Sequence, residues 1–163
     1  MGLFGAMDIS ASGLTAQRLR LDVISSNIAN INTTRTGQTT EAGNPIPYRR
    51  QVTVFVPRPA ETDFSRVLGS VLGKQQSAVG QGVQVQTVVG DSAPFQLEYD
   101  PSSPDAAKAG DPEVPEGYVR KPNVNIVTEM IDMISATRAY DANITALNAS
   151  KSLATKALEI GRG

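Results

Sequence analysis

Residues 122–160 read PNVNIVTEMIDMISATRAYDANITALNASKSLATKALEI, and this stretch decides the fold. Apolar or small side chains recur in it at alternating steps of four and three, which is the heptad spacing of a coiled-coil helix. The two rows run through Ile126, Met133, Tyr140, Leu147 and Ala154, and through Met130, Thr137, Ile144, Lys151 and Leu158. Because neither Pro nor Gly interrupts the rows, they predict one helix of roughly 50 Å. A helix of that length needs another long helix beside it.

The chain carries signals that would begin and end this helix, and a candidate partner near the N-terminus. Asn125 can cap the start, and Gly161 stands just past the end. Two more rows near the N-terminus are spaced by seven residues, through Leu14, Leu21 and Ile28, and through Gln17, Ile24 and Ile31. Because both ends have the heptad spacing, they can pair as antiparallel helices if the residues between them form an inserted domain.

The middle of the chain reads as short strands and loops. Residues 33–47 are polar and contain Gly, Asn and Pro, which predicts a loop. Alternating apolar residues predict strands over 48–56, 82–89 and 95–99, with a turn near Gly90 and Asp91. Residues 61–81 fit a short helix or an irregular excursion equally well. Residues 100–121 are rich in Pro and acidic side chains, so they are expected to form an extended connector.

These elements together predict an α+β protein. Its long N- and C-terminal helices are expected to pair as an antiparallel coiled coil, with a small β-rich domain inserted between them. The expected division gives residues 1–32 to the first helix, 33–121 to the β-rich middle with its loops, and 122–163 to the second helix.

The composition excludes several classes of function. Since the 163 residues include no His and no Cys, neither a Ser-His-Asp triad nor a Cys/His zinc site can be built from this chain. The net charge of −1 argues against a nucleic-acid-binding face, which needs a basic surplus. No apolar run approaches the roughly eighteen residues of a membrane span. We therefore expect no cofactor, no nucleic-acid partner and no membrane insertion.

The acidic residues of the connector are the remaining candidates for a metal or catalytic site. They are Asp100, Asp105, Asp111, Glu113 and Glu116. Prolines interrupt them, and the Asp/Gly spacing of a calcium loop is missing. A solvated connector with exposed acids is the better interpretation, and we expect no catalytic, cofactor or metal site.

The most apolar part of the chain lies at the start of the C-terminal helix, at Met130, Ile131, Met133 and Ile134. Together with Val127, these residues widen the heptad stripe into a two-sided surface, which more than one neighbour is needed to cover. Asp132 lies off both rows, so it is expected to be exposed and Asp132→Asn nearly silent. The residues expected to form an assembly interface are Leu14, Leu21, Ile24, Ile28, Ile31, Ile126, Met130, Met133, Ile134, Tyr140, Ile144, Leu147 and Leu158.

Four segments of the sequence carry a family signature. Near the N-terminus, residues 10–30 read SASGLTAQRLRLDVISSNIAN. Towards the C-terminus, residues 117–125 read GYVRKPNVN and residues 129–143 read EMIDMISATRAYDAN. These segments resemble the bacterial flagellar basal-body rod protein family. Residues 99–106, YDPSSPDA, are similar to the proximal, C-type members in particular.

The resemblance implies a structural protein of the flagellar basal body, and not an enzyme. Such proteins are exported unfolded through the flagellar type III apparatus and assemble helically, through their terminal helices, into the drive shaft that crosses the periplasm. The implied partners are other proximal and distal rod subunits and the ring and adaptor proteins of the basal body.

The residues alone leave two other functions open. A soluble coiled-coil adaptor with a β-domain binding head would form a closed dimer instead of a polymer. A glycan or peptidoglycan hydrolase would need two convergent carboxylates in a cleft, whereas the acids here are scattered along a Pro-rich connector.

Overall fold

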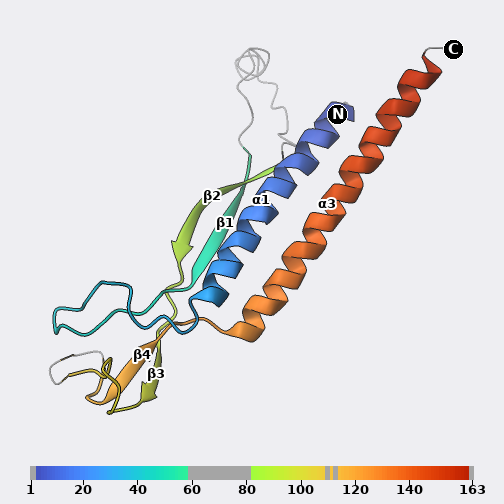
Figure 1. Ribbon diagram of the computed structural model, residues 1–163. Helices are drawn as coiled ribbons and strands as arrows, with labels where there is room; N and C mark the ends of the chain where they lie inside the picture. Colours follow the sequence, from blue (N-terminus) through green and yellow to red (C-terminus); the bar gives the residue numbers. More distant parts are fainter. Residues whose placement is uncertain (1–2, 59–81, 109–110, 112–113, 162–163) are drawn as a thin grey trace, which may run out of the picture. The chain divides into compact units, whose positions relative to one another are not determined.

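The computed structural model describes residues 3–58, 82–108, 111 and 114–161. Within these residues the chain forms helices α1 (Leu3–Ala29) and α3 (Ile126–Ile160) and strands β1 (Gln51–Pro57), β2 (Val83–Gly90), β3 (Gln96–Tyr99) and β4 (Tyr118–Lys121), as Figure 1 shows. The predicted α+β class is confirmed. The expectations for residues 61–81 and for Glu113 fall outside the described residues.

The C-terminal helix begins and ends where its capping residues predict. The Asn125 side-chain Oδ1 accepts hydrogen bonds from the backbone N–H groups of Val127 (2.9 Å) and Thr128 (3.3 Å), which is N-cap geometry. Glu129 lies in the first turn, where the helix dipole favours an acidic side chain. The helix then runs for 35 residues, and the Gly161 N–H bonds to the Ala157 carbonyl at its end.

The N-terminal helix ends in a short asparagine-rich segment. Asn30 donates to the Ser26 carbonyl through both its backbone N–H and its side-chain amide, which completes the last turn. The expected loop over residues 33–47 is confirmed. It carries one isolated bridge, between Thr39 and Pro45, and Gly43 makes its turn with a φ of +79°.

The strands form two separate two-stranded sheets, β1 with β2 and β3 with β4. In the second sheet Gln96 lies opposite Lys121 and Tyr99 opposite Tyr118, in antiparallel register. All three strands predicted from alternation are present, but the first starts at Gln51 and not at residue 48. The reason is that the Tyr48 N–H bonds to the Thr33 carbonyl and the Arg50 N–H to the Asn123 side chain, instead of to a strand.

The expected connector over residues 100–121 needs two corrections. Its last four residues are strand β4, and the preceding described residues form turns. The prediction of exposed acids is wrong for Asp105 and Asp111, whose side chains are 13% and 3% exposed because each carboxylate pairs with an arginine.

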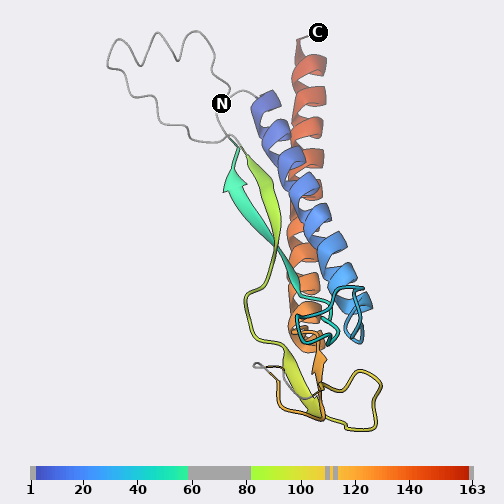
Figure 2. The ribbon, with the colours of Figure 1, turned by 90° about the vertical axis from the view of Figure 1, so that its left-hand side faces the viewer.

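The chain divides into two compact units, and each unit takes a part of both helices. Unit 1 consists of Met1–Leu19, Val54–Thr87 and Ala136–Gly163, and unit 2 consists of Arg20–Thr53 and Val88–Ser135. In unit 1 the α1 and α3 segments run side by side in Figure 1 and Figure 2. They approach closely at Gly13, where a Cβ atom would lie 2.9 Å from the side chain of Asn143. Among the described residues, no helix is long and apolar enough to cross a membrane.

Candidate assembly surface and polar junction

A band of large apolar side chains lies exposed along the first two turns of α3, in unit 2. We call it the α3 stripe, and its members are Ile126 (42% exposed), Val127 (61%), Met130 (53%), Ile131 (63%) and Ile134 (55%). Their spacing at i, i+1, i+4, i+5 and i+8 puts them on one side of the helix. A contiguous apolar surface of this kind on a polar chain marks a site of protein association.

The buried side of α3 is made of polar and small residues instead. Glu129 and Ala136 are completely buried (0% exposed), whereas Met130, one position along from Glu129, is more than half exposed. Of the two predicted heptad rows, Met133, Tyr140, Leu147 and Ala154 are half-buried, while most of the other row is exposed. The helix is therefore rotated about its axis relative to the orientation that would bury its most apolar side.

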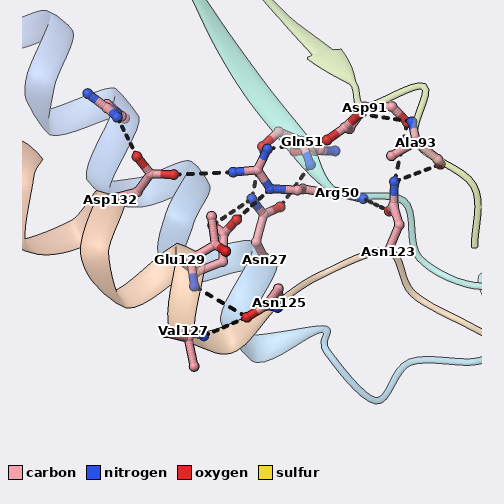
Figure 3. Close-up of polar contacts among 12 residues, drawn as sticks. Asn27, Arg50, Gln51, Asp91, Ala93, Asn123, Asn125, Val127, Glu129 and Asp132 are labelled. Carbon is pink, nitrogen blue, oxygen red and sulfur yellow. Dashed lines mark hydrogen bonds and ion pairs between the residues drawn. The ribbon is translucent and has the colours of Figure 1, made fainter. Parts of the chain in front are cut away.

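Glu129 belongs to a cluster of polar side chains in unit 2 that is centred on Arg50, and we call this cluster the polar junction (Figure 3). Its members are Arg20, Asn27, Arg50, Asp91, Asn123, Glu129 and Asp132. The Arg50 guanidinium donates from Nε to Glu129 Oε1 at 2.5 Å, and its other nitrogens contact Asp91 and Asp132, both at 3.3 Å. Asp132 also accepts from Arg20 at 2.8 Å. The Arg50 guanidinium thus contacts three carboxylates, two from α3 and one from the turn after β2.

The amide of Asn27, in α1, joins this cluster to the backbone that leads into β1. Its Nδ2 donates to Glu129 Oε2 at 3.0 Å and to the Gln51 carbonyl at 2.8 Å, while its Oδ1 accepts from the Gln51 N–H at 2.9 Å. The Tyr48 hydroxyl donates to the same oxygen at 3.0 Å. All the hydrogen-bonding capacity of a side chain that is 1% exposed is therefore used.

Asn123, just before α3, closes the junction on the other side. Its Oδ1 accepts the Arg50 N–H at 2.8 Å, and its Nδ2 donates to the Ala93 carbonyl at 3.0 Å. The junction consequently ties together α1, the entry to β1, the turn after β2 and the start of α3.

The contacts of Arg50 and Asp91 favour the ionised forms of these two side chains. Burial works to lower the pKa of the Arg50 guanidinium, but the hydrogen bonds and charges of Glu129 and Asp91 outweigh it and raise that pKa above its usual value. The backbone N–H of Ala93 and then the Arg50 guanidinium lower the pKa of Asp91. With two arginines and three carboxylates, the junction has a net charge of −1.

The sequence-based expectation for Asp132 is wrong. It is half-buried and forms ion pairs with Arg20 and Arg50, because it lies on the same side of α3 as Glu129. Asp132→Asn is therefore not a silent control. Heptad counting missed both Glu129 and Asp132 because it searches for apolar positions. Glu129 is identified by its contacts with Asn27 and Arg50, and Asp132 by its contacts with Arg20 and Arg50.

A second polar cluster in unit 2 holds the loop over residues 33–47 to the connector. Arg120 donates from one nitrogen to both oxygens of Asp111, at 3.0 and 2.9 Å, and Asn44 donates to the same carboxylate at 2.8 Å. Thr34 (2.7 Å) and Arg35 donate to Asp105, and these two groups, Thr34 first, hold its pKa below the usual value. Among the described residues, no group of acidic side chains could hold a metal ion.

The predicted interface residues occupy three kinds of environment. Ile24 is buried. The half-buried members are Leu14, Leu21, Ile28, Ile31, Met133, Tyr140, Ile144 and Leu147. The exposed members are Ile126, Met130, Ile134 and Leu158. The heptad pattern thus selected both exposed and half-buried residues of α3, and it did not distinguish the exposed side of the helix from the half-buried side.

Comparison with known proteins gives the same family at both ends of the chain. Residues 7–35 match the family described as "Flagella basal body rod protein", and residues 116–160 match "Flagellar basal body rod FlgEFG protein C-terminal". The chain is 47% identical to the flagellar basal-body rod protein FlgC of Borreliella burgdorferi over 163 residues, which is all of both chains. It is 46% identical to FlgC of Bacillus subtilis, over 99% of this chain and all of that one.

The chain belongs to the flagellar basal-body rod proteins, of the FlgC type. A more distant member, FlgC of Escherichia coli O157:H7, is 36% identical over 162 residues and is likewise matched over its full length. The resemblance read from the sequence is confirmed. The protein is a structural subunit of the proximal part of the flagellar basal-body rod and is not an enzyme. The regions matched by the two family models contain α1 from Met7 onward, together with the α3 stripe and Glu129.

Proposed function

We propose that this rod subunit assembles through the exposed apolar side of its C-terminal helix, with the α3 stripe covered by neighbouring subunits. The observation that carries the proposal is the exposure of five large apolar side chains within nine positions. Burying one such side chain contributes roughly 1.5–3 kcal/mol. A contact between two different surfaces of identical subunits extends into a helical assembly when its rotation does not close into a ring, and a helical assembly is the geometry of a shaft.

We further propose that α1 and α3 pair as an antiparallel coiled coil within each subunit. In support of this, Arg20 contacts Asp132 whereas Asn27, further along α1, contacts Glu129, further back along α3. The half-buried heptad residues, such as Leu21 and Leu147, would line that pairing. Residues 1–32 and 122–163 would then form the assembling part, with residues 33–121 attached outside it.

Membership of the family implies assembly with other rod components. We propose that the more specific partners are proximal and distal rod subunits together with the ring and adaptor proteins of the basal body. Delivery through the flagellar type III export apparatus is part of the same proposal. The resemblance to the rod family supports these partners.

The substitution Ile131→Asp tests the assembly surface. Because Ile131 is 63% exposed, the isolated subunit should tolerate Asp there, whereas a covered stripe in the rod would bury an unpaired charge. Cells that produce Ile131→Asp in place of the native subunit are expected to make the protein but no complete rods, and to be non-motile.

The matched control is Leu97→Asp. Leu97 is also exposed (46%) and isomeric with Ile131, but it lies on β3, away from the α3 stripe in sequence and secondary structure. Motility is expected to survive in this control. Normal rods built from Ile131→Asp subunits would show that the α3 stripe is not an assembly contact.

A further inference from the structure

Two sides of α3 differ sharply in polarity, and the less apolar one faces α1. In unit 2, Glu129 and Asp132 are the α3 side chains that hydrogen-bond to α1 as described above. Met130 and Ile131, their immediate neighbours in sequence, stay exposed. Burial of apolar surface alone would favour the opposite orientation, because each buried side chain of this size contributes more than a polar one. Some other interaction must therefore select the observed face.

We propose that the polar junction selects which face of α3 contacts α1, and so keeps the α3 stripe from being buried within its own chain. That the open stripe is then used for assembly rests on the function proposed above. The selection itself is a property of the single subunit.

Hydrogen-bond geometry makes the junction specific to one rotation of α3. Glu129 receives Arg50 at one oxygen and Asn27 at the other, so both oxygens are occupied by donors from separate segments. The backbone at Gln51 holds Asn27 in place, and Asn123 holds the backbone of Arg50. Rotating α3 to bury Met130 would withdraw the Glu129 carboxylate from both donors and leave it without compensation.

Buried ionic groups are suited to selecting one orientation of a helix, but they add little to the stability of the folded chain. Removing a carboxylate and a guanidinium from water costs about as much as their attraction returns, so apolar replacements of both are often neutral or stabilising. A polar residue at a helix seam does, however, fix register and partner choice, because the alternatives leave it unpaired. The polar junction has this character, with a completely buried carboxylate beside five exposed apolar side chains.

The test replaces both members of the central pair, in the variant Arg50→Met/Glu129→Leu. This double variant leaves no buried charge unpaired, because Asp132 keeps Arg20 and Asp91 keeps the Ala93 N–H. The matched control, Lys156→Met/Glu159→Leu, removes an exposed ion pair from the same helix with the same net change of charge.

Since the chain contains no Cys, a single introduced Cys reports local exposure through its rate of reaction with a maleimide. Ile131→Cys reports the α3 stripe and Ile24→Cys reports a buried position of α1 that is 4% exposed. In otherwise native monomer, whose mass is verified by ultracentrifugation, the stripe position should react at least about tenfold faster. In the double variant we expect the maleimide reaction of Ile131→Cys to slow at least about fivefold, because α3 turns its apolar side inward. The reaction of Ile24→Cys should stay slow.

Two outcomes would overturn the proposal. If Ile131→Cys reacts at its native rate in a folded double variant, the polar junction does not select the face. If both positions react fast and helical circular dichroism is lost, the pair serves stability instead. Because the cysteine readout is made on monomers, it can refute face selection by the polar junction while Ile131→Asp still blocks rod formation in cells. Equally, the cysteine readout can support face selection while Ile131→Asp rods prove normal, which would refute assembly through the α3 stripe alone.

Discussion

The substitution Arg50→Met tests how the polar junction holds its charges. Glu129 is completely buried and would lose the guanidinium at 2.5 Å, keeping only the 3.0 Å hydrogen bond from Asn27 among its side-chain contacts described above. Removing one partner of a buried ion pair costs about 3–5 kcal/mol. Because the Arg50 side chain is 20% exposed and Asn27 still donates, we expect the lower end, about 3 kcal/mol.

Urea unfolding followed by tyrosine fluorescence measures this loss in unit 2. The chain has no Trp, and three of its four tyrosines, Tyr48, Tyr99 and Tyr118, lie in unit 2. For a slope of about 2 kcal/mol per molar urea, a loss of about 3 kcal/mol lowers the midpoint by about 1.5 M.

Two further variants separate a buried pair from a surface pair. Arg58→Met removes the exposed ion pair with Asp8, whose side chains are 47% and 68% exposed, so it should move the midpoint by less than about 0.5 M. Arg50→Met/Glu129→Leu should recover most of the loss, because no buried charge is left unpaired. An Arg50→Met midpoint equal to that of the native chain would refute the assignment of Glu129 as a buried, Arg50-dependent carboxylate.

Three other predictions concern the helices and the connector. Leu147→Asp, at a half-buried heptad position, should be produced yet fail to enter rods. The control Asp141→Asn, at an exposed position, should support motility. Normal rods built from Leu147→Asp subunits would show that Leu147 does not line the pairing of α1 with α3. Gly5→Ala should stabilise α1 by about 0.5–1 kcal/mol, measured by thermal unfolding. Gly13→Ala should lack that gain, because the added Cβ would lie 2.9 Å from the side chain of Asn143 in α3. Equal gains from Gly5→Ala and Gly13→Ala would contradict this close packing. The pKa of Asp105 is held below the usual 3.8, so its contribution to stability is complete above that value and is lost as the pH falls below it. Asp105→Asn should lower stability at pH 7 and flatten its decline below about pH 4, and an unchanged acid profile would argue against the Asp105 contacts.

The sequence predicted both helices because their signals are local. Heptad spacing, the Asn125 cap and Gly161 define α3 within one or two residues of its observed ends. Strands β1, β2 and β3 were likewise found from alternation over a few residues, whereas β4 lies in the expected connector and was missed. Their pairing was not predicted, because β2 pairs with β1 across a long sequence separation although β3 follows it directly in the chain.

Most of the errors about side-chain exposure concern charged residues whose partners lie far away in sequence. Asp105 reads as part of a solvated acidic connector, yet its partners Thr34 and Arg35 are about seventy residues away. Asp132 was expected to be exposed, yet it pairs with Arg20 and Arg50. Glu129, for which the heptad pattern gave no expectation, pairs with Arg50. Composition cannot supply such long-range pairings, so the polar junction is visible only in the folded chain.

The proposed assembly requires that neighbouring subunits cover the α3 stripe in the rod. Electron cryomicroscopy of isolated basal bodies that contain this chain measures this directly. We predict that Val127, Ile131 and Ile134 lie within about 4.5 Å of apolar side chains from an adjacent subunit. A rod in which these three side chains face solvent, or pack only against their own chain, would contradict it.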